Sequence, residues 1–313
     1  MADEAKVTKL EDLLGDFARR EDNDKIDQVA IIGAGVMGRG IAQTIASAGI
    51  EVVILEKSQD YLNASLEQLK KNMEIEIGRW AMTESEMKAI LSRISWTLDF
   101  TMLKHADIII EAVDESFQLK RMIFKKLDEI AKSDAIIISN TSTLSLTQIA
   151  EITHRKDKII GVHFLNPVPK IPLVELVRAL ETSDDTVEKI KKFASRIGKT
   201  AVEVYEYPGF VTTRVIVPYL NEAMHILLEG VASAKDIDTA MKLGYSMNIG
   251  PLELADSMGL DEVLSWMIHL YRDLGEPRYR PCPILRKLVR DRKLGKKTGE
   301  GFFKYDENDK IIS

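Results

Sequence analysis

The stretch VAIIGAGVMGRGIAQTIASAG, residues 29–49, begins as an apolar strand, turns through three glycines and continues in a helical pattern. Gly33, Gly35 and Gly38 have the G-x-G-x-x-G spacing, and a second apolar strand follows at 51–55. In that context Gly33 permits a tight turn, Gly35 lets the backbone approach a pyrophosphate, and Gly38 lets helix and strand pack closely. The stretch therefore predicts a dinucleotide-binding βαβ unit, in which the N-terminus of the helix faces the phosphates.

Glu56 ends the second strand, 18 residues after Gly38. A carboxylate at this point can accept both ribose hydroxyls of adenosine and repels a 2′-phosphate, so it favours NAD over NADP. Lys57 follows directly and weakens that preference. The alternative is a plain strand–turn–helix that binds nothing, and the context of the motif favours dinucleotide binding.

From this unit onward the chain alternates apolar strands with amphipathic helices. Helical patterns near 36–48, 59–80, 116–132 and 184–197 separate continuous Ile/Val runs, which predicts a parallel sheet covered on both faces. The expected strands are QVAII, EVVIL, ISWTL, DIIIEAV, AIIIS, IIGVHF, VELVRA and AVEVYE. After Pro208 the strand runs stop and helical patterns occupy 211–293. The predicted fold is α/β: a Rossmann-type doubly wound sheet followed by an all-helical C-terminal domain.

The expected segments are an N-terminal extension at 1–27, an NAD-binding domain at 28–207 and a helical substrate and dimerisation domain at 208–313. Apolar residues at helical spacing between 10 and 17 predict a short amphipathic helix in the extension, and a frayed tail is the alternative. The extension is rich in acids and lacks an apolar segment, so it is neither a secretory signal nor a typical transit peptide.

Composition narrows the class of protein. The chain has 313 residues, 45% of them hydrophobic and 29% charged, which is ordinary for a soluble globular protein. The net charge of -6 argues against a nucleic-acid partner, and no uncharged apolar run is long enough to cross a membrane. The single cysteine, Cys282, excludes an internal disulfide framework and fits a reducing compartment, so we expect a cytoplasmic protein.

Candidate reactive groups follow two of the expected strands. Ser142 comes after AIIIS and His163 ends IIGVH, so both can reach the crevice at the carboxyl ends of the strands. A histidine can take a hydroxyl proton while hydride leaves the same carbon, and Glu175 is a candidate carboxylate to fix its tautomer. A structural histidine, with a strand carboxylate facing water, is the competing interpretation from spacing alone. We find no metal-ligand spacing and expect no metal.

From about Val29 to Tyr305 the chain resembles the L-3-hydroxyacyl-CoA dehydrogenase family. The resemblance rests on IGAGVMGRGIA, EAVDESFQLK, SNTSTLS, HFLNPVPKIPLVE, PGFVTTR, DIDTAMKLG and GKKTGEGFF, in the family's order and spacing. It implies reversible oxidation of a (3S)-3-hydroxyacyl-CoA to a 3-oxoacyl-CoA by NAD. It places the catalytic pair on His163 and Glu175 and the site serine on Ser142, which also contacts substrate. It further implies a homodimer formed through the helical C-terminal domain.

The resemblance also assigns binding residues. The implied cofactor-binding residues are Gly33, Gly35, Met37, Gly38, Glu56, Glu115, Lys120 and Asn166. The alternative for Glu115 and Lys120 is an ion pair on a helix surface, for which a spacing of five residues is poor geometry. A CoA-binding serine matches Ser65, but the family's lysine position holds Asn72, so Lys71 is the substitute candidate. A solvated lysine face is the alternative there.

Two departures from the family pattern concern the substrate. Thr213 stands in PGFVTTR where the family has an active-site asparagine, and residues 245–248 differ in a loop that lies beside the acyl site in the family. We therefore expect an acyl-CoA substrate with a short or unusual acyl group, with Thr213 in the catalytic set. The alternatives are a dehydrogenase of a non-CoA hydroxy acid and a dinucleotide-binding protein without turnover.

Overall fold

The computed structural model describes residues 26–142 and 144–312. The chain divides into two compact units, and their described residues are 26–141 and 146–203 for unit 1, and 142, 144, 145 and 204–312 for unit 2. The amphipathic helix expected between residues 10 and 17 lies outside the described residues. The division after Glu203 lies a few residues before the boundary expected near Pro208.

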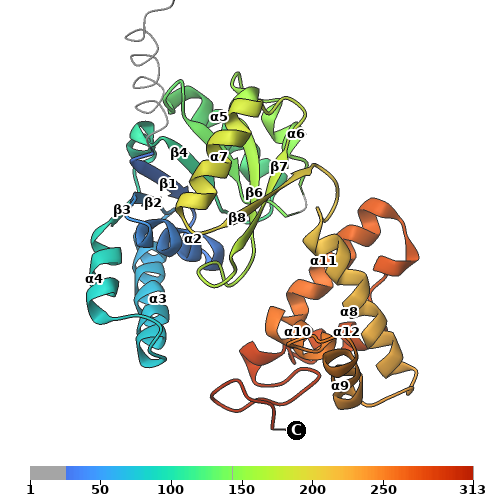
Figure 1. Cartoon of the computed structure of the whole chain (residues 1–313). Coiled ribbons are helices and arrows are strands. Elements are labelled where there is room, and N and C mark those ends of the chain that lie inside the picture. The colour runs from blue at the N-terminus through green and yellow to red at the C-terminus, as the bar shows by residue number, and fades with distance from the viewer. Residues whose placement is uncertain (1–25, 143, 313) are drawn as a thin grey trace, which may run out of the picture. The chain divides into compact units, whose positions relative to one another are not determined.

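In the described part of unit 1, eight strands form one sheet in the order β3-β2-β1-β4-β5-β6-β7-β8 (Figure 1). The strands are β1 (Gln28–Ile32), β2 (Glu51–Leu55), β3 (Ile94–Thr97), β4 (Ile108–Glu111), β5 (Ile136–Ser139), β6 (Ile159–Phe164), β7 (Leu173–Arg178) and β8 (Thr200–Tyr205). The paired strands from β1 to β6 are parallel, and the order reverses between β1 and β4. A crevice for ligands is expected at the carboxyl ends of the strands beside that reversal.

Strand β7 corrects the expectation of a wholly parallel sheet, because it runs antiparallel to β6. Residues 165–172 join the two strands without a helix. A parallel crossover needs a dozen or more residues, whereas this shorter link can only turn the chain back. The reversal places residues of β6 and β7 directly opposite each other, and His163 faces Glu175 in that register.

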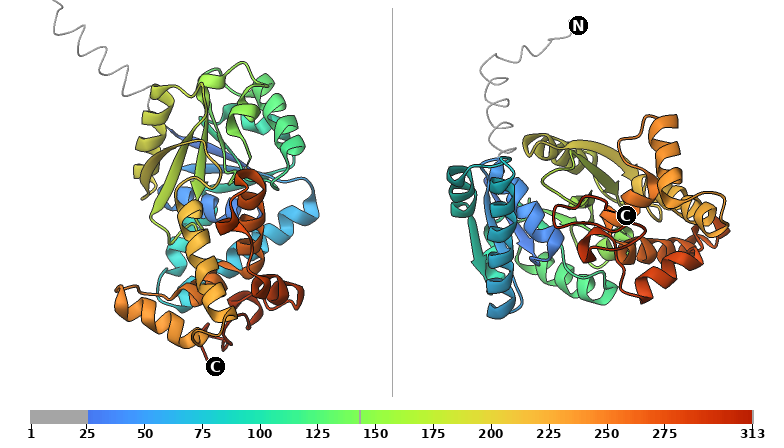
Figure 2. Two further views of the ribbon diagram at one scale, coloured as in Figure 1. Left: turned by 90° about the vertical axis from the view of Figure 1, so that its right-hand side faces the viewer. Right: turned by 90° about the horizontal axis from the view of Figure 1, so that it is seen from below.

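Helices cover both faces of the sheet. Those of unit 1 are α2 (Val36–Ser47), α3 (Gln59–Gly78), α4 (Glu84–Ser92), α5 (Phe117–Ile130), α6 (Leu146–Ala150) and α7 (Asp184–Arg196), with short 3-10 turns at η1 (Phe100–His105) and η2 (Lys156–Lys158). Seen from the side, the strands lie between α7 on one face and the green helices α5 and α6 on the other (Figure 2). Apolar side chains of α2, α3 and α7 pack on alternate residues of the strands and form the main core.

The helices of unit 1 begin where side-chain oxygens can cap them. Ser58, Ser116 and Ser183 each accept a hydrogen bond from a backbone N–H of the first turn of α3, α5 and α7. Thr83 and Glu86 form a complete capping box at α4. Such caps satisfy amide groups that have no partner inside the helix and contribute about 1 kcal/mol each.

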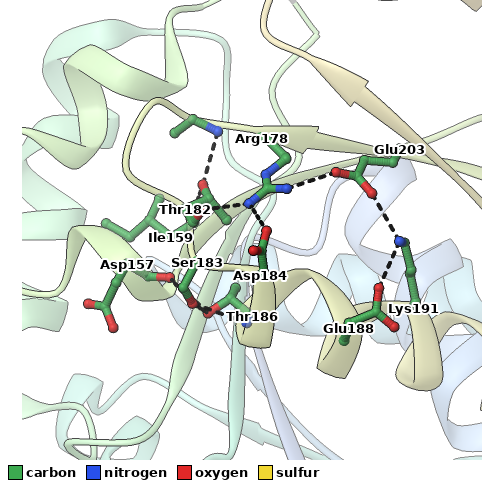
Figure 3. A network of polar contacts seen from close by, with 11 residues as sticks. Asp157, Ile159, Arg178, Thr182, Ser183, Asp184, Thr186, Glu188, Lys191 and Glu203 are labelled. Carbon is green, nitrogen blue, oxygen red and sulfur yellow. Dashed lines mark hydrogen bonds and ion pairs between the residues drawn. The ribbon is translucent and has the colours of Figure 1, made fainter.

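A charged network fastens the last two strands to α7 (Figure 3). Arg178 on β7 donates to Glu203 on β8 and to Asp184 in the first turn of α7. Lys191 on α7 contacts Glu203 and Glu188, at 2.9 and 2.8 Å. Asp184 and Glu188 are largely exposed and the other three side chains are partly accessible, so water screens the pairs and the network contributes mainly to alignment of the three elements.

Unit 2 is helical. Its helices are α8 (Thr212–Leu228), α9 (Ala234–Gly244), α10 (Pro251–Met258), α11 (Leu260–Leu274), α12 (Pro283–Arg290), η3 (Pro277–Tyr279) and η4 (Lys296–Thr298). The buried Asp256 accepts hydrogen bonds from the backbone N–H of Phe302 and Phe303 and from the Tyr305 hydroxyl, so it anchors the C-terminal GKKTGEGFF segment. None of the described helices combines the length and apolar character that a membrane crossing requires.

Candidate cofactor and active site

The glycine loop lies between β1 and α2 at the predicted place. Gly33 has a φ of +90°, and a Cβ on it would lie 2.9 Å from the carbonyl oxygen of Ala112. A Cβ on Gly38 would lie 1.9 Å from the oxygen of Gly33, so any side chain there would push the helix off the loop. Around Gly35 there is open space, and α2 begins beside it without a side-chain cap. Met37 packs against the core. The loop thus leaves room for a phosphate at the N-terminus of the helix.

Glu56 lies against this loop. Its Oε1 accepts a hydrogen bond of 2.6 Å from the backbone N–H of Ala34. Arg39, which sequence reasoning did not select, donates from Nη1 to the Ala34 carbonyl at 2.7 Å. Burial lowers the pKa of the Arg39 guanidinium, and the attraction of Glu56 opposes that shift. Lys57 lies over the Tyr61 ring, 3.7 Å from its centroid. The Glu56 carboxylate is therefore fixed directly against the glycine loop.

The structure does not bring Ser65 and Lys71 together. Ser65 is buried, and its hydroxyl donates to the Ala34 carbonyl at 3.1 Å, which stabilises the glycine loop from α3. Lys71 is exposed. Six residues along a helix turn the side-chain direction by about 120°, so the two residues point to different faces of α3. Asn72, seven residues on, lies nearly in line with Ser65 but is exposed.

Glu115 and Lys120 form the ion pair that their spacing argued against, with Nζ and Oε2 3.3 Å apart. Ser116 is the N-cap of α5, so Glu115 lies outside the helix. The residue before the N-cap folds back over the fourth helical residue, a position in which the spacing rule for helix surfaces does not hold. Lys120 is also fully buried rather than on a surface, and its closest carboxylate is Glu111 at 2.6 Å. Sequence analysis did not select Glu111, which ends the buried strand β4. Its charge at the end of an apolar run was the signal that could have marked it as a site residue.

His163 and Glu175 lie side by side on adjacent strands. Nδ1 of His163 is 2.7 Å from Oε2 of Glu175, and only 7% and 1% of their side chains are exposed. Their twelve-residue separation is the consequence of the turn between β6 and β7, which makes them cross-strand partners. A buried imidazole bonded to a buried carboxylate is an arrangement that can accept a proton at its other ring nitrogen.

The segments that frame His163 are held in place by polar contacts. The Asn140 side chain accepts a hydrogen bond from the backbone N–H of Phe164, next to His163, at 3.2 Å. The proline turn after β6, which carries the exposed Asn166, is held by Lys199. Its buried ammonium donates to the carbonyls of Val168 and Ile171 at 2.5 and 2.7 Å. Neither Asn140 nor Lys199 was selected from sequence, because their role depends on backbone groups far along the chain.

Two further candidates belong to unit 2. Ser142 lies in the short segment after β5 that groups with this unit, and its side chain is partly buried. Thr213 is buried in the first turn of α8. Among the described residues, no group of three or more His, Cys, Asp or Glu side chains is arranged to hold a metal ion.

Comparison with known proteins adds independent findings. The family model for the NAD binding domain of 3-hydroxyacyl-CoA dehydrogenase matches residues 28–207, and the model for its C-terminal domain matches 209–305. A probable 3-hydroxybutyryl-CoA dehydrogenase of Bacillus subtilis (strain 168) is 46% identical over 283 residues, which cover 90% of this chain and 99% of that protein. A 3-hydroxybutyryl-CoA dehydrogenase of Clostridioides difficile is 43% identical over 280 residues, 90% of this chain and 100% of that protein. The crystal structure of (S)-3-hydroxybutyryl-CoA dehydrogenase from Ralstonia eutropha matches with a TM-score of 0.82 at 41% identity, covering 90% of this chain and 100% of that one.

Proposed function

Because the chain belongs to the 3-hydroxyacyl-CoA dehydrogenase family, we propose that it oxidises (3S)-3-hydroxyacyl-CoA with NAD through an acid–base pair, His163 and Glu175. The observation that carries this proposal is the buried 2.7 Å contact between the two side chains at the carboxyl end of β6. That end of the sheet is where ligands of doubly wound folds bind. Burying two ionisable side chains costs free energy that apolar residues would not, so a chemical role explains their burial better than a packing role.

The geometry defines what each side chain does. Glu175 accepts a hydrogen bond from Nδ1 of His163, which selects the tautomer with its lone pair on Nε2. Nε2 then takes the proton of the substrate hydroxyl during oxidation and returns it during reduction. The imidazolium that forms in between is stabilised by the negative charge of the Glu175 carboxylate.

The glycine loop and Glu56 fit NAD. Open space at Gly35 and the helix N-terminus beside it suit a pyrophosphate, and Glu56 suits the ribose hydroxyls. When bound, NAD supplies the acceptor for the hydride that leaves C3 of the substrate. Glu115 and Asn166 contact its nicotinamide half in this proposal. Lys120 is fully buried, so it acts through Glu115.

Ser142 and Thr213 remain to be assigned. We assign both residues to substrate contact. Ser65 and Lys71 point to different faces of α3, so in this proposal at most one of them contacts the CoA. Threonine offers one hydroxyl and a methyl where asparagine offers a planar amide with two donors and an acceptor. That exchange supports a substrate with a bulkier or functionalised acyl group in place of plain 3-hydroxybutyryl-CoA.

The test is a steady-state assay of the purified protein with NADH and a panel of straight-chain, branched and functionalised 3-oxoacyl-CoA thioesters. Free 3-oxo acids of matched chain length serve as the comparison. The proposal predicts turnover of thioesters and none of the free acids. Turnover confined to free acids, or binding of NADH without turnover of any substrate, contradicts it.

Two properties of the whole enzyme complete the proposal. Large apolar side chains are exposed on the described part of unit 2, among them Val215, Val231 and Leu243 at 66%, 70% and 80% exposure. Exposed apolar residues of this kind support a homodimer through the helical unit, which sedimentation equilibrium tests as twice the chain mass of 35.2 kDa. Cys282 is buried and unbridged, which fits a cytoplasmic enzyme and is tested by cell fractionation.

A further inference from the structure

Behind Glu115, the buried Lys120 pairs with a second carboxylate, Glu111, to which the proposed reaction assigns no role. The Lys120 ammonium and the Glu111 carboxylate are 2.6 Å apart, and neither side chain is exposed at all. Glu111 is fully hydrogen-bonded: Oε1 also accepts from the backbone N–H of Val113 at 2.9 Å, and Oε2 accepts from the Ser139 hydroxyl at 2.7 Å. A buried pair of this kind contributes little to stability compared with apolar residues of the same size, because both charges lose their hydration. Its effect is to fix the geometry of the groups around it.

Those groups are the turn that follows β4. The hydrogen bond from Val113 folds this turn back onto Glu111. Between them, Ala112 lies against Gly33, where a single added carbon would come within 2.9 Å of its carbonyl oxygen. The turn therefore packs so closely against the glycine loop that a small change in its backbone would shift the loop.

The turn ends at Glu115, whose carboxylate is held from two sides. Lys120 Nζ lies 3.3 Å from Oε2, and the Thr141 hydroxyl donates to Oε1 at 2.6 Å. Ser139 ends β5 and Thr141 follows two residues later, so the end of this strand and the segment after it contact both carboxylates. Glu115 is the partly exposed member, with 29% of its side chain accessible.

We propose that Glu111 is a positioning residue for NAD: it fixes the 112–115 turn through Val113 and, through Lys120, orients the Glu115 carboxylate. The proposal rests on the role of Glu115 in holding the nicotinamide half of NAD. In wild type the charge of the buried Lys120 is balanced by the equally buried Glu111. Glu115 can therefore stay at its partly exposed position. Without the charge of Glu111, Glu115 is the carboxylate that still pairs with Lys120 among the described residues. Lys120 then draws Glu115 inward, because a buried ammonium left unpaired is strongly unfavourable.

The test is Glu111→Gln, which keeps the shape of the side chain and removes its charge. Affinity for NADH, measured by fluorescence titration, is expected to fall about tenfold, equivalent to about 1.4 kcal/mol. The KM for NAD is expected to change more than kcat, which a general loss of packing would not produce. Asp107→Asn is the matched control, since Asp107 lies just before the same strand and pairs with Lys132 at 2.7 Å. Both variants are expected to lose stability, and only Glu111→Gln to lose affinity for NADH.

Two further variants, Glu115→Ala and its combination with Glu111→Gln, distinguish failure of this inference from failure of the proposed function. If Glu111 acts through Glu115, the double variant Glu111→Gln with Glu115→Ala binds NADH no more weakly than Glu115→Ala alone, whereas independent effects add. The inference is overturned if the losses of NADH affinity in the two single variants add in the double variant. It is also overturned if Glu111→Gln binds NADH like wild type while Glu115→Ala binds it weakly. Unchanged affinity in Glu115→Ala instead overturns the role of Glu115 in the proposed function. Ser139→Ala, which removes one hydrogen bond from Glu111, is used if Glu111→Gln does not fold, and the same losses are expected in weaker form.

Discussion

Glu175→Gln removes the charge beside His163 and keeps the size and hydrogen-bonding capacity of the side chain. In wild type the carboxylate is 2.7 Å from Nδ1 of His163, and 1% of it is exposed. Water therefore cannot replace the lost charge when His163 takes the substrate proton. The substitution changes the free energy of the neutral imidazole little but raises that of the imidazolium strongly. It therefore raises the barrier of the chemical step, in which the imidazolium forms.

The size of the effect follows from the geometry. A hydrogen bond to an ionised group is about twice as strong as a neutral one, and burial strengthens it further, so the loss is about 2–4 kcal/mol. At about 1.4 kcal/mol for each factor of ten, kcat is expected to fall about 30- to 1000-fold. Affinity for NADH is expected to stay at the wild-type value, because the substitution lies outside the residues assigned to the cofactor.

The assay follows NADH absorbance with a 3-oxoacyl-CoA that the wild-type protein turns over. Glu203→Gln is the matched control, because Glu203 pairs with Arg178 on β7 but makes no contact with His163 among the described interactions. It is expected to lower stability and leave kcat unchanged. Near wild-type kcat in Glu175→Gln would refute the pair. A double variant, Glu175→Gln with His163→Gln, that is much slower than His163→Gln alone would also refute it, because the effects on kcat of two residues that act as a unit do not add.

Three further predictions concern other parts of the site. Glu56→Gln is expected to lower the preference for NAD over NADP about tenfold, because it removes the charge that repels a 2′-phosphate; an unchanged ratio of kcat/KM values for the two cofactors contradicts this. Burial lowers the pKa of Lys199, so the unfolded chain binds more protons at pH values between the folded and unfolded pKa values. The stability of wild type relative to Lys199→Met is therefore expected to rise as pH increases through that interval toward the unfolded pKa of 10.5. Urea denaturation at several pH values measures that difference, and a decrease with pH contradicts the assignment. Thr213→Asn is expected to gain kcat/KM on 3-hydroxybutyryl-CoA and to lose it on bulkier 3-hydroxyacyl-CoAs, and a wild-type protein that already prefers the simple substrate contradicts the proposal for the acyl group.

Local patterns were sufficient to predict most of the fold. The apolar runs, the glycine spacing and the helical patterns each reflect contacts close in sequence, and the described structure has the predicted sheet and the helical second unit. The direction of β7 was missed, although the short link at 165–172 carried the information, because the Ile/Val-rich composition of a strand does not reveal its direction.

The site was less predictable, for physical reasons that differ between residues. The opposed positions of His163 and Glu175 depend on the antiparallel register, which spacing alone does not give. The pairing of Glu115 with Lys120 depends on where α5 begins, since one residue lies outside the helix. Lys199 binds two carbonyls about thirty residues earlier in the chain, a contact that only the folded structure brings about.

The most direct test of the central claim is the comparison of wild type with His163→Gln. The account predicts that kcat falls by about 10²–10⁴, the usual contribution of a general base, in both directions of the reaction. It also predicts that the affinity for NADH and the free energy of unfolding remain close to those of wild type, since glutamine can still hydrogen-bond to Glu175. Turnover near the wild-type rate in a folded His163→Gln protein that binds NADH would contradict the account, because the proton would then be taken by another group.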